Sequence, residues 1–294
     1  MQESENDLLR RVRKIEIKTR GLSSEIFAGK YHTAFRGRGM SFSEVREYRA
    51  GDDVRDIDWN VTARSRKPHI KVYEEERELT MMLVVDVSAS RLFGSTDRTK
   101  KNIITEIAAV LAFSAAQNND KVGCIFFSDR IEKFIPPKKG RSHILAIIRE
   151  LVDFRPASAG TKLSEPLRML TNVAKKRCTT FLLSDFLDPA GDREAMEDAL
   201  KIAGSKHDLV GIRVCDPREA ELPDVGIVEL QDAESGRKVW VDTSSRAVRD
   251  HYAEAWRARS ASIGELLRHH RIDTATVSTD GDYVAELIKL FRQR

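Results

Sequence analysis

Long apolar runs are missing from this 294-residue sequence, and so are several short motifs that identify common enzymes. No apolar run approaches the roughly 20 residues of a transmembrane helix, so we expect no direct membrane span. No G-x-x-x-x-G-K-[ST] loop is present, which excludes a P-loop nucleotide site. The G-x-S-x-G elbow of many hydrolases and the H-E-x-x-H pair of zinc proteases are absent as well.

Cysteine is scarce. The three residues Cys124, Cys178 and Cys215 are far apart, each lies in or beside an apolar run, and none forms a C-x-x-C pair. This pattern predicts small buried core residues in a reducing compartment. The first residues, MQESENDLLRR, are polar and do not resemble a secretory signal peptide. We therefore expect a cytoplasmic protein, which leaves attachment to a membrane through a partner open.

Charge is nearly balanced, because 50 Lys and Arg residues face 46 Asp and Glu residues and give a formal net charge of +4. An excess this small does not argue for nucleic acid as a partner. Basic residues do gather between Arg10 and Arg20, but acidic residues are interspersed, so we favour a solvated helix face over a nucleic-acid-binding arm. Hydrophobic residues make up 41% of the chain, enough to bury the core of a large α/β domain.

Apolar runs of strand length alternate with helical patterns over residues 79–294. Repeated strand–helix units with apolar strands predict a doubly wound, mostly parallel, Rossmann-like α/β sheet flanked by helices. The expected strands are residues 81–86, 122–127, 131–135, 179–184, 208–215 and 272–277. The expected helices are residues 98–118, 142–151, 164–175, 193–203, 245–270 and 282–292. A late hairpin is expected at residues 226–230 and 238–242, and Pro136-Pro137 should end the third strand.

Residues 1–78 do not show the pattern of an independent core. We expect an amphipathic helix from Glu5 to Arg20, which Gly21 would end. Turn residues and dense charge then predict a small β-rich or irregular annex, with strands near residues 44–48 and 70–74. We expect Trp59 to anchor this annex by packing rather than to be a binding hot spot for a partner.

Four acidic residues form a cluster in the annex, flanked by arginines: Asp52, Asp53, Asp56 and Asp58. One interpretation is a surface network of salt bridges, each of which is weak. The other is a segment that folds back onto a cation site or a partner. The sequence leaves both interpretations open.

The stretch MMLVVDVSAS, residues 81–90, organises the larger domain. Its uninterrupted apolar part predicts a strand buried on both faces, as in a parallel sheet covered by helices. Asp86, Ser88 and Ser90 follow at the carboxyl end of that strand, where open α/β sheets place their ligands. Carboxylate and hydroxyl oxygens suit a hard divalent cation, so we predict a site for Mg²⁺, with Mn²⁺ or Ca²⁺ as alternatives.

Two later residues are further candidate ligands. Thr161 follows a glycine just before a predicted helix, and Asp185 closes the apolar run TTFLLSD. Two neutral hydroxyls, those of Ser88 and Ser90, and few carboxylates would leave the ion partly uncompensated. The site would therefore attract an acidic side chain of a partner. A catalytic two-metal site would usually surround its ions with more carboxylates.

The five residues, in this order, resemble the metal-ion-dependent adhesion site of von Willebrand factor A domains. In that family a D-x-S-x-S loop, a later Thr and a later Asp surround one Mg²⁺. The resemblance implies that Ser88, Ser90 and Thr161 are direct or near-direct ligands. It also implies that Asp86 and Asp185 act directly or through water, and that an acidic group of a partner takes the sixth position.

A second resemblance covers the annex. The pattern G-x-x-F-x-x-x-R-x-Y-x-x-G-D-D-x-R-x-I-D-W, from Gly39 to Trp59, is similar to the signature of the DUF58 family upstream of its A-type domain. Relatives are commonly encoded beside MoxR-type AAA+ ATPases, so the resemblance implies such an ATPase as the partner. Many relatives also have membrane helices before this segment, where this chain has only an amphipathic helix.

These observations lead us to expect a non-enzymatic, Mg²⁺-dependent adaptor or co-chaperone that presents a client protein to a MoxR-type ATPase. The ATPase or the client would donate an Asp or Glu to the metal. The alternative is a metal-dependent phosphohydrolase with Asp86 as its nucleophile, although Ser88 stands where such an enzyme would have a second carboxylate. A third interpretation is a structural subunit whose site binds no metal.

Overall fold

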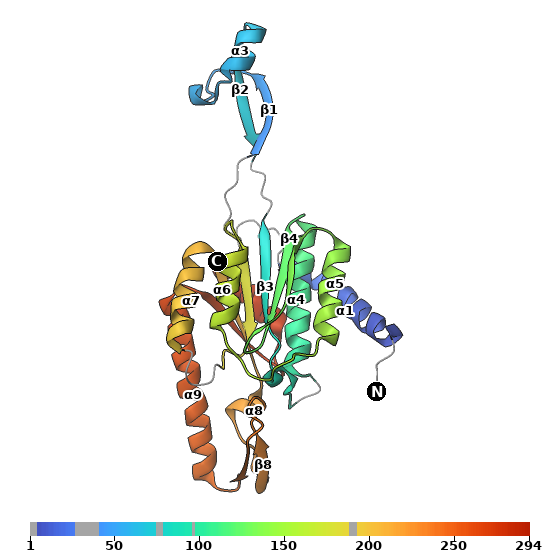
Figure 1. Ribbon diagram of the computed structural model, residues 1–294, viewed down its shortest axis with the longest axis vertical. Coiled ribbons are helices and arrows are strands. Elements are labelled where there is room, and N and C mark those ends of the chain that lie inside the picture. Colours follow the sequence, from blue (N-terminus) through green and yellow to red (C-terminus); the bar gives the residue numbers. More distant parts are fainter. Residues whose placement is uncertain (1–4, 27–40, 75–78, 96–97, 188–192) are drawn as a thin grey trace. The chain divides into compact units, whose positions relative to one another are not determined.

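The computed structural model describes residues 5–26, 41–74, 79–95, 98–187 and 193–294. The chain divides into two compact units, residues 37–79 and the remainder. Each unit is described by itself below (Figure 1). Among the residues within these ranges, no helix is long and apolar enough to cross a membrane.

A six-stranded sheet is the centre of the larger unit and has the spatial order β10-β7-β6-β3-β4-β5. All neighbours in it are parallel except β4 and β5. Its strands are β3 (Thr80–Asp86), β4 (Lys121–Phe127), β5 (Ile131–Lys138), β6 (Thr179–Ser184), β7 (Asp208–Cys215) and β10 (Asp273–Ser278). Numbered along the chain, the order is 3-2-1-4-5-6, that of a doubly wound sheet whose direction of winding reverses between its first and fourth strands. The predicted fold class is thereby confirmed.

Helices cover both faces of this sheet (Figure 1). They are α4 (Lys100–Gln117), α5 (Arg141–Asp153), α6 (Ser164–Val173), α7 (Arg193–Lys206), α9 (Arg246–His269) and α10 (Tyr283–Gln293). Two single turns, the 3-10 helix η2 (Ala89–Leu92) and α8 (Pro217–Ala220), follow β3 and β7. The sequence patterns located every strand and long helix of this unit, but neither of these short turns.

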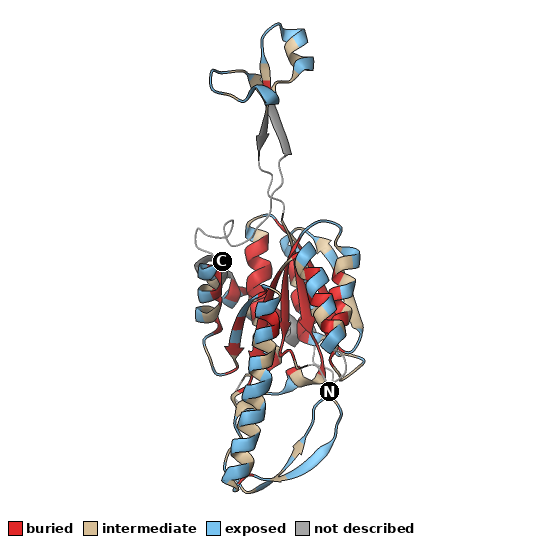
Figure 2. Ribbon diagram, turned by 90° about the vertical axis from the view of Figure 1, so that its left-hand side faces the viewer, coloured by how far each residue is buried: buried red, intermediate tan, exposed pale blue. Residues whose placement is uncertain are grey.

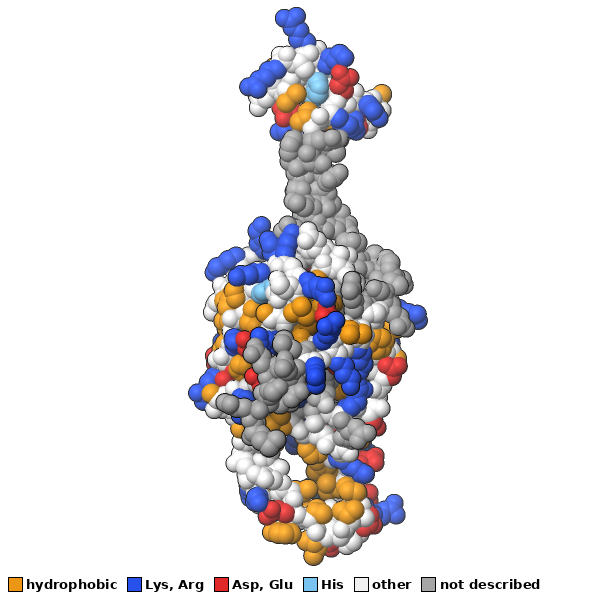
Figure 3. Space-filling view, turned by 90° about the vertical axis from the view of Figure 1, so that its right-hand side faces the viewer, with side chains coloured by type: hydrophobic (Ala, Val, Ile, Leu, Met, Phe, Trp, Pro, Cys, Tyr) orange, Lys and Arg blue, Asp and Glu red, His pale blue; other side chains and the backbone are white. Residues whose placement is uncertain are grey.

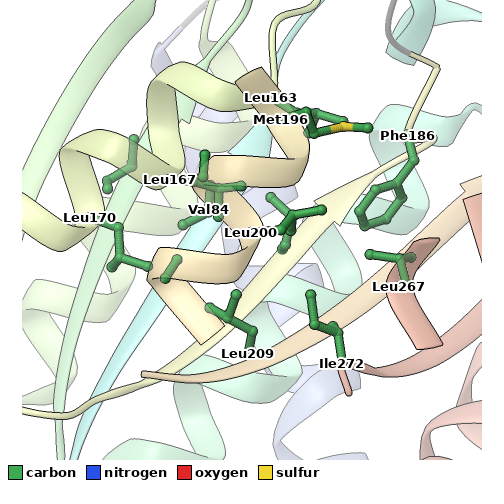
Figure 4. Close-up of a cluster of buried hydrophobic side chains, with 14 of the residues drawn as sticks. Val84, Leu163, Leu167, Leu170, Phe186, Met196, Leu200, Leu209, Leu267 and Ile272 are labelled. Atoms are coloured by element: carbon green, nitrogen blue, oxygen red, sulfur yellow. The ribbon is translucent and has the colours of Figure 1, made fainter. Parts of the chain in front are cut away.

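The side chains of β3 alternate between two buried layers, as the apolar run predicted. Met82 and Val84 pack in a cluster with leucines of α6, α7 and the end of α9, including Leu167 and Leu200 (Figure 4). On the other face, Leu83 pairs in register with Phe181, whose ring contacts that of Phe291 in α10. Figure 2 shows this buried core as a continuous red layer. The three cysteines are buried, as expected.

Helix α1 (Glu5–Ile26) packs on the helical layer of α4, α5 and α10. Glu16 pairs with Arg141, and Lys18 with Glu106 at 2.7 Å. The expected division at residues 78/79 placed this helix with the annex, whereas its contacts place it with the α/β unit. The helix also continues through Gly21, because a glycine weakens a helix without ending it.

Strand β5 does not end at Pro136 and Pro137, which corrects the sequence-based expectation. The strand lies at the edge of the sheet, beside β4 only. An edge strand can hold proline because the missing N–H groups need no partner on the outer side. The tight packing at Gly123 of β4 fits this arrangement, since an added Cβ would lie 3.0 Å from the nitrogen of Pro137.

The annex is a two-stranded antiparallel sheet of β1 (Ser41–Glu47) and β2 (His69–Glu74), with η1 (Val54–Asp56) and α3 (Trp59–Ser65) between the strands. Its expected strands are therefore present, while Gly39 lies outside the described residues. Trp59 is 68% exposed, so the expectation that it anchors the annex by packing was wrong. It is the first residue of α3.

Three carboxylates of the acidic cluster have partners inside the annex. Asp52 accepts hydrogen bonds from Arg46 at 2.8 Å on both oxygens. Asp53 caps η1 through the N–H of Arg55, and Asp58 caps α3. These contacts are those of a local network of ion pairs and helix caps.

A second hairpin extends from the larger unit and consists of β8 (Ile227–Gln231) and β9 (Lys238–Asp242). It follows α8 and leads into α9, of which only Leu266 and Leu267 at the C-terminal end are buried. Figure 2 shows the other end of α9 and the hairpin projecting together from the body of the unit. The hairpin was predicted within one residue of its observed position.

Candidate metal site

The site begins at the reversal point of the sheet, where β3 and β6 run side by side. Val85 pairs in register with Leu183, so Asp86 and Ser184 meet at the carboxyl edge. The Ser184 hydroxyl donates to Asp86 Oδ2 at 2.6 Å, and the Ser88 N–H donates to Oδ1 at 2.9 Å. Asp86 is only 2% exposed.

The loop after β3 brings two hydroxyls to the same point. Ser88 Oγ lies 3.1 Å from Ser90 Oγ, with Ser88 fully buried and Ser90 half-buried. The backbone of this loop is fixed on both sides, because the N–H of Val87 bonds to Phe127 and that of Ala89 bonds to Ala159. The D-x-S-x-S segment is thus a rigid turn with its oxygens on one side.

Thr161 enters from the loop between α5 and α6, and it is 3% exposed. Glu132 of β5 holds this loop by accepting from the N–H groups of Ala157 and Ser158 at 3.1 Å. The Thr161 hydroxyl donates to Glu234 Oε1 at 2.6 Å. Glu234 lies in the turn of the β8–β9 hairpin, 73 residues further along the chain.

Asp185 lies one residue past β6, in a strained turn. Phe186 has a φ of +58°, a left-handed conformation that is unusual for a residue with a bulky side chain. Burial of its ring in the core and a 2.9 Å hydrogen bond from its N–H to Ser184 hold this conformation. The Asp185 carboxylate accepts from the N–H of Leu187 at 3.0 Å, and its carbonyl accepts from Arg213 at 3.3 Å.

Lys100, at the start of α4, is the main countercharge. Its Nζ lies 2.7 Å from Asp185 Oδ2 and 2.5 Å from Glu219 Oε1, and its side chain is 1% exposed. Burial alone would lower the pKa of Lys100, but the two carboxylates outweigh burial and raise it. The ammonium of Lys100 therefore neutralises Asp185, which favours contact of this carboxylate with an ion through water.

Two other carboxylates of the site have a raised pKa, although the charge of the buried Arg91 interacts with one of them, Asp86. Burial raises the pKa of Asp86 to about 6, and the charge of Asp185 adds to the rise, against hydrogen bonds from Ser184 and Ser88. Burial also raises the pKa of Glu234 to about 7, which the Thr161 hydrogen bond opposes and the charges of Asp185 and Asp86 reinforce. A cation between these groups would relieve their mutual repulsion.

All five predicted residues thus gather at one edge of the sheet. Their role as ligands stays a prediction. Among the described residues, no three His, Cys, Asp or Glu side chains are arranged to hold a metal ion, so any site here depends on the hydroxyls. Sequence reasoning missed Lys100, Ser184, Glu219 and Glu234. Only Ser184, beside Asp185 at a predicted strand end, carried a signal that could have revealed it.

Comparison with known proteins supports the resemblance to one family. The family model described as "Protein of unknown function DUF58" matches residues 44–262. The uncharacterized protein Rv1480 of Mycobacterium tuberculosis is 31% identical over 287 residues, which is 96% of this chain and 88% of that protein.

A solved structure of low sequence identity has a similar fold. The conserved hypothetical protein BatB of Bacteroides thetaiotaomicron aligns with a TM-score of 0.50 and 15% identity, over 73% of this chain and 98% of that one. A von Willebrand factor type A protein of Catenulispora acidiphila aligns with a TM-score of 0.40 and 11% identity, over 76% of this chain and 43% of that one.

Proposed function

This chain belongs to the DUF58 family, and from that premise and the geometry of its site we propose that it binds protein partners through a divalent cation. The ion would be Mg²⁺, held at the carboxyl edge of β3 and β6. When bound, it would supply a positive charge and a coordination position for a carboxylate of the partner.

One observation carries this proposal: a hydroxyl-rich set of buried oxygens converges on the reversal point of the sheet. Ser88, Ser90 and Thr161 would contribute hydroxyls, and Asp86 would contribute a carboxylate. Asp185 would act through water, because the ammonium of Lys100 already neutralises its charge. These donors fit a hard cation, which prefers oxygen ligands and keeps some of its waters.

The charge balance favours binding over catalysis. Lys100 neutralises Asp185, so the ion would face fewer negative charges than in a catalytic two-metal site. Asp86 is a poor candidate for a nucleophile, because it is buried and both of its oxygens accept hydrogen bonds. A non-enzymatic role is therefore part of the proposal, and phosphate-ester hydrolysis is the alternative to be tested.

The partner we propose is a MoxR-type AAA+ ATPase, or a client that this protein presents to it in the cytoplasm. The family resemblance supports this choice, and the acidic side chain required at the metal limits which surface of the partner can dock. The protein would then act as an adaptor whose contact with its partner depends on the ion.

Metal binding can be tested by calorimetric titration with Mg²⁺ and Mn²⁺. We expect one site in the wild-type protein and a loss of affinity of at least about tenfold in Asp86→Asn, which keeps the size of the side chain. Asp198→Asn removes an exposed carboxylate of α7 and is the matched control. Absence of heat and of any thermal shift in the wild-type protein would support the structural-subunit interpretation instead.

Partner binding can be tested by measuring how much of a MoxR-type ATPase the immobilised protein captures. The wild-type protein is compared in Mg²⁺ and in EDTA, and Asp86→Asn is compared in Mg²⁺. We expect capture in Mg²⁺ only, and unchanged capture by Asp198→Asn. Equal capture under all conditions would reject the cation bridge. Metal-dependent turnover of a generic phosphate ester, lost in Asp86→Asn, would favour the hydrolase.

A further inference from the structure

The turn of the β8–β9 hairpin is built to present one carboxylate. Asp232 Oδ1 accepts from the N–H groups of Glu234 and Ser235, at 3.0 and 2.6 Å. Gly236 completes the turn with a φ of +68°, a conformation that glycine adopts without strain. Ala233, Ser235 and Gly236 are exposed, whereas Glu234 between them is half-buried. The turn therefore directs Glu234 alone toward the body of the unit.

Glu234 contacts a predicted ligand of the cation site. Its Oε1 accepts the 2.6 Å hydrogen bond from Thr161, a residue that the resemblance to von Willebrand factor A domains implies as a ligand. The negative charges of Asp86 and Asp185 are also close enough to interact with it. A cation would stabilise a carboxylate placed among like charges. Two buried cations nearby already interact with other carboxylates, Lys100 with Asp185 and Glu219, and Arg91 with Asp86.

The hairpin that carries Glu234 buries little of its own surface. Ile227 and Trp240 are each 69% exposed and Val239 is 47% exposed. Figure 3 shows hydrophobic side chains gathered at the end of the α/β unit where the hairpin lies. An isolated two-stranded hairpin is only marginally stable in water. Its position therefore depends on contacts with the rest of the unit, and the hydrogen bond between Thr161 and Glu234 supplies one of them at its turn.

We propose that Glu234 is an internal ligand of the cation site, which occupies the position that a partner's carboxylate would take. This inference rests on the proposed function. The hairpin would close the site in the absence of a partner, and a partner would bind by exchanging its own acidic side chain for Glu234. The exchange would release the turn of the hairpin from the body of the unit.

The test uses Mn²⁺ as the probe and the full-length protein. Glu234→Gln keeps an oxygen that can accept from Thr161 but removes the charge. We expect its Mn²⁺ affinity to be at least about tenfold weaker than that of the wild type. Glu229→Gln, which removes an exposed charge from β8 of the same hairpin, should bind Mn²⁺ like the wild type. Glu234→Ala should regain affinity in acetate buffer relative to chloride buffer, because acetate can supply the missing carboxylate.

Hydrogen exchange gives a second readout. In the wild-type protein, Mn²⁺ should slow amide exchange in the turn between β8 and β9, and it should not do so in Glu234→Gln. Unchanged Mn²⁺ affinity in Glu234→Gln, with exchange in the turn insensitive to Mn²⁺, would refute the internal ligand and leave the metal site standing. Absence of Mn²⁺ binding by the wild-type protein would overturn both proposals.

Discussion

The buried charge of Lys100 permits the sharpest test of how the site is held together. We predict that Lys100→Met destabilises the α/β unit by about 3–5 kcal/mol, the usual cost of removing one partner of a buried ion pair. The Lys100 and Asp185 side chains are 1% and 3% exposed, so water cannot replace the lost ammonium. Methionine fills much of the same volume, which limits any contribution from a cavity.

Urea denaturation followed by circular dichroism would measure this loss. For a slope of about 2–3 kcal/mol per molar urea, the midpoint should fall by roughly 1–2.5 M. Lys176→Met removes the same charge from an exposed turn and should change stability by less than about 0.5 kcal/mol. The double variant Lys100→Met/Asp185→Asn should be more stable than Lys100→Met, because no unpaired charge then remains at Asp185.

The outcome that would refute this reasoning is a loss below about 1 kcal/mol in Lys100→Met, the value of an exposed ion pair. Strictly additive effects of the two substitutions would refute it as well. Lys100→Met should also bind Mn²⁺ more tightly than the wild type, because the ammonium of Lys100 beside Asp185 repels a metal ion. Lower stability together with higher metal affinity would separate a charge effect from general damage to the fold.

Two further predictions concern groups around the site. Ser184→Ala removes the hydroxyl that donates to Asp86 and accepts from Phe186, so we expect a loss of about 1–3 kcal/mol in urea denaturation. Burial alone would raise the pKa of Asp216, but hydrogen bonds from Ser95 and Thr279 outweigh burial and hold this pKa below its ordinary value. Its contribution to stability is therefore complete above pH about 4 and is lost as the pH falls through the lowered pKa of the folded state. Asp216→Asn should be less stable than the wild type at pH 7, and the difference between the two should shrink in denaturation series below pH about 4.

The sequence predicted the strands that carry the site and the residues at their ends, because short local stretches of sequence determine both. An uninterrupted apolar run specified β3, and Asp86 at its end followed from the strand boundary. Asp185 followed in the same way from β6. The meeting of the two residues needed one fact that no single stretch contains, namely that β3 and β6 are neighbours in the sheet.

The residues that set the charge and the hydrogen bonds of the site could not be predicted, because their contacts join distant parts of the chain. Lys100 reaches Asp185 across 85 residues, and Thr161 reaches Glu234 across 73. In the sequence, Lys100 is one of two lysines at a helix start and Glu234 is one polar residue in a turn. Neither position differs locally from a solvated surface residue. Pro136 was misjudged for a similar reason, because only the sheet order makes β5 an edge strand.

The two proposals together require that Glu234 affects two affinities in opposite directions. As a ligand it would strengthen metal binding, and as an occupant of the partner's position it would weaken partner binding. If the hairpin were open in about one molecule in 100, the apparent affinity for an acidic partner would be about 100-fold below the intrinsic affinity. Glu234→Gln would remove the competition between Glu234 and the partner's carboxylate, and it would lower the affinity for the metal ion. At saturating metal concentration, the variant should therefore bind its partner more tightly than the wild type. A residue that only stabilised the hairpin would not produce this reversal, because its loss would leave the metal affinity unchanged.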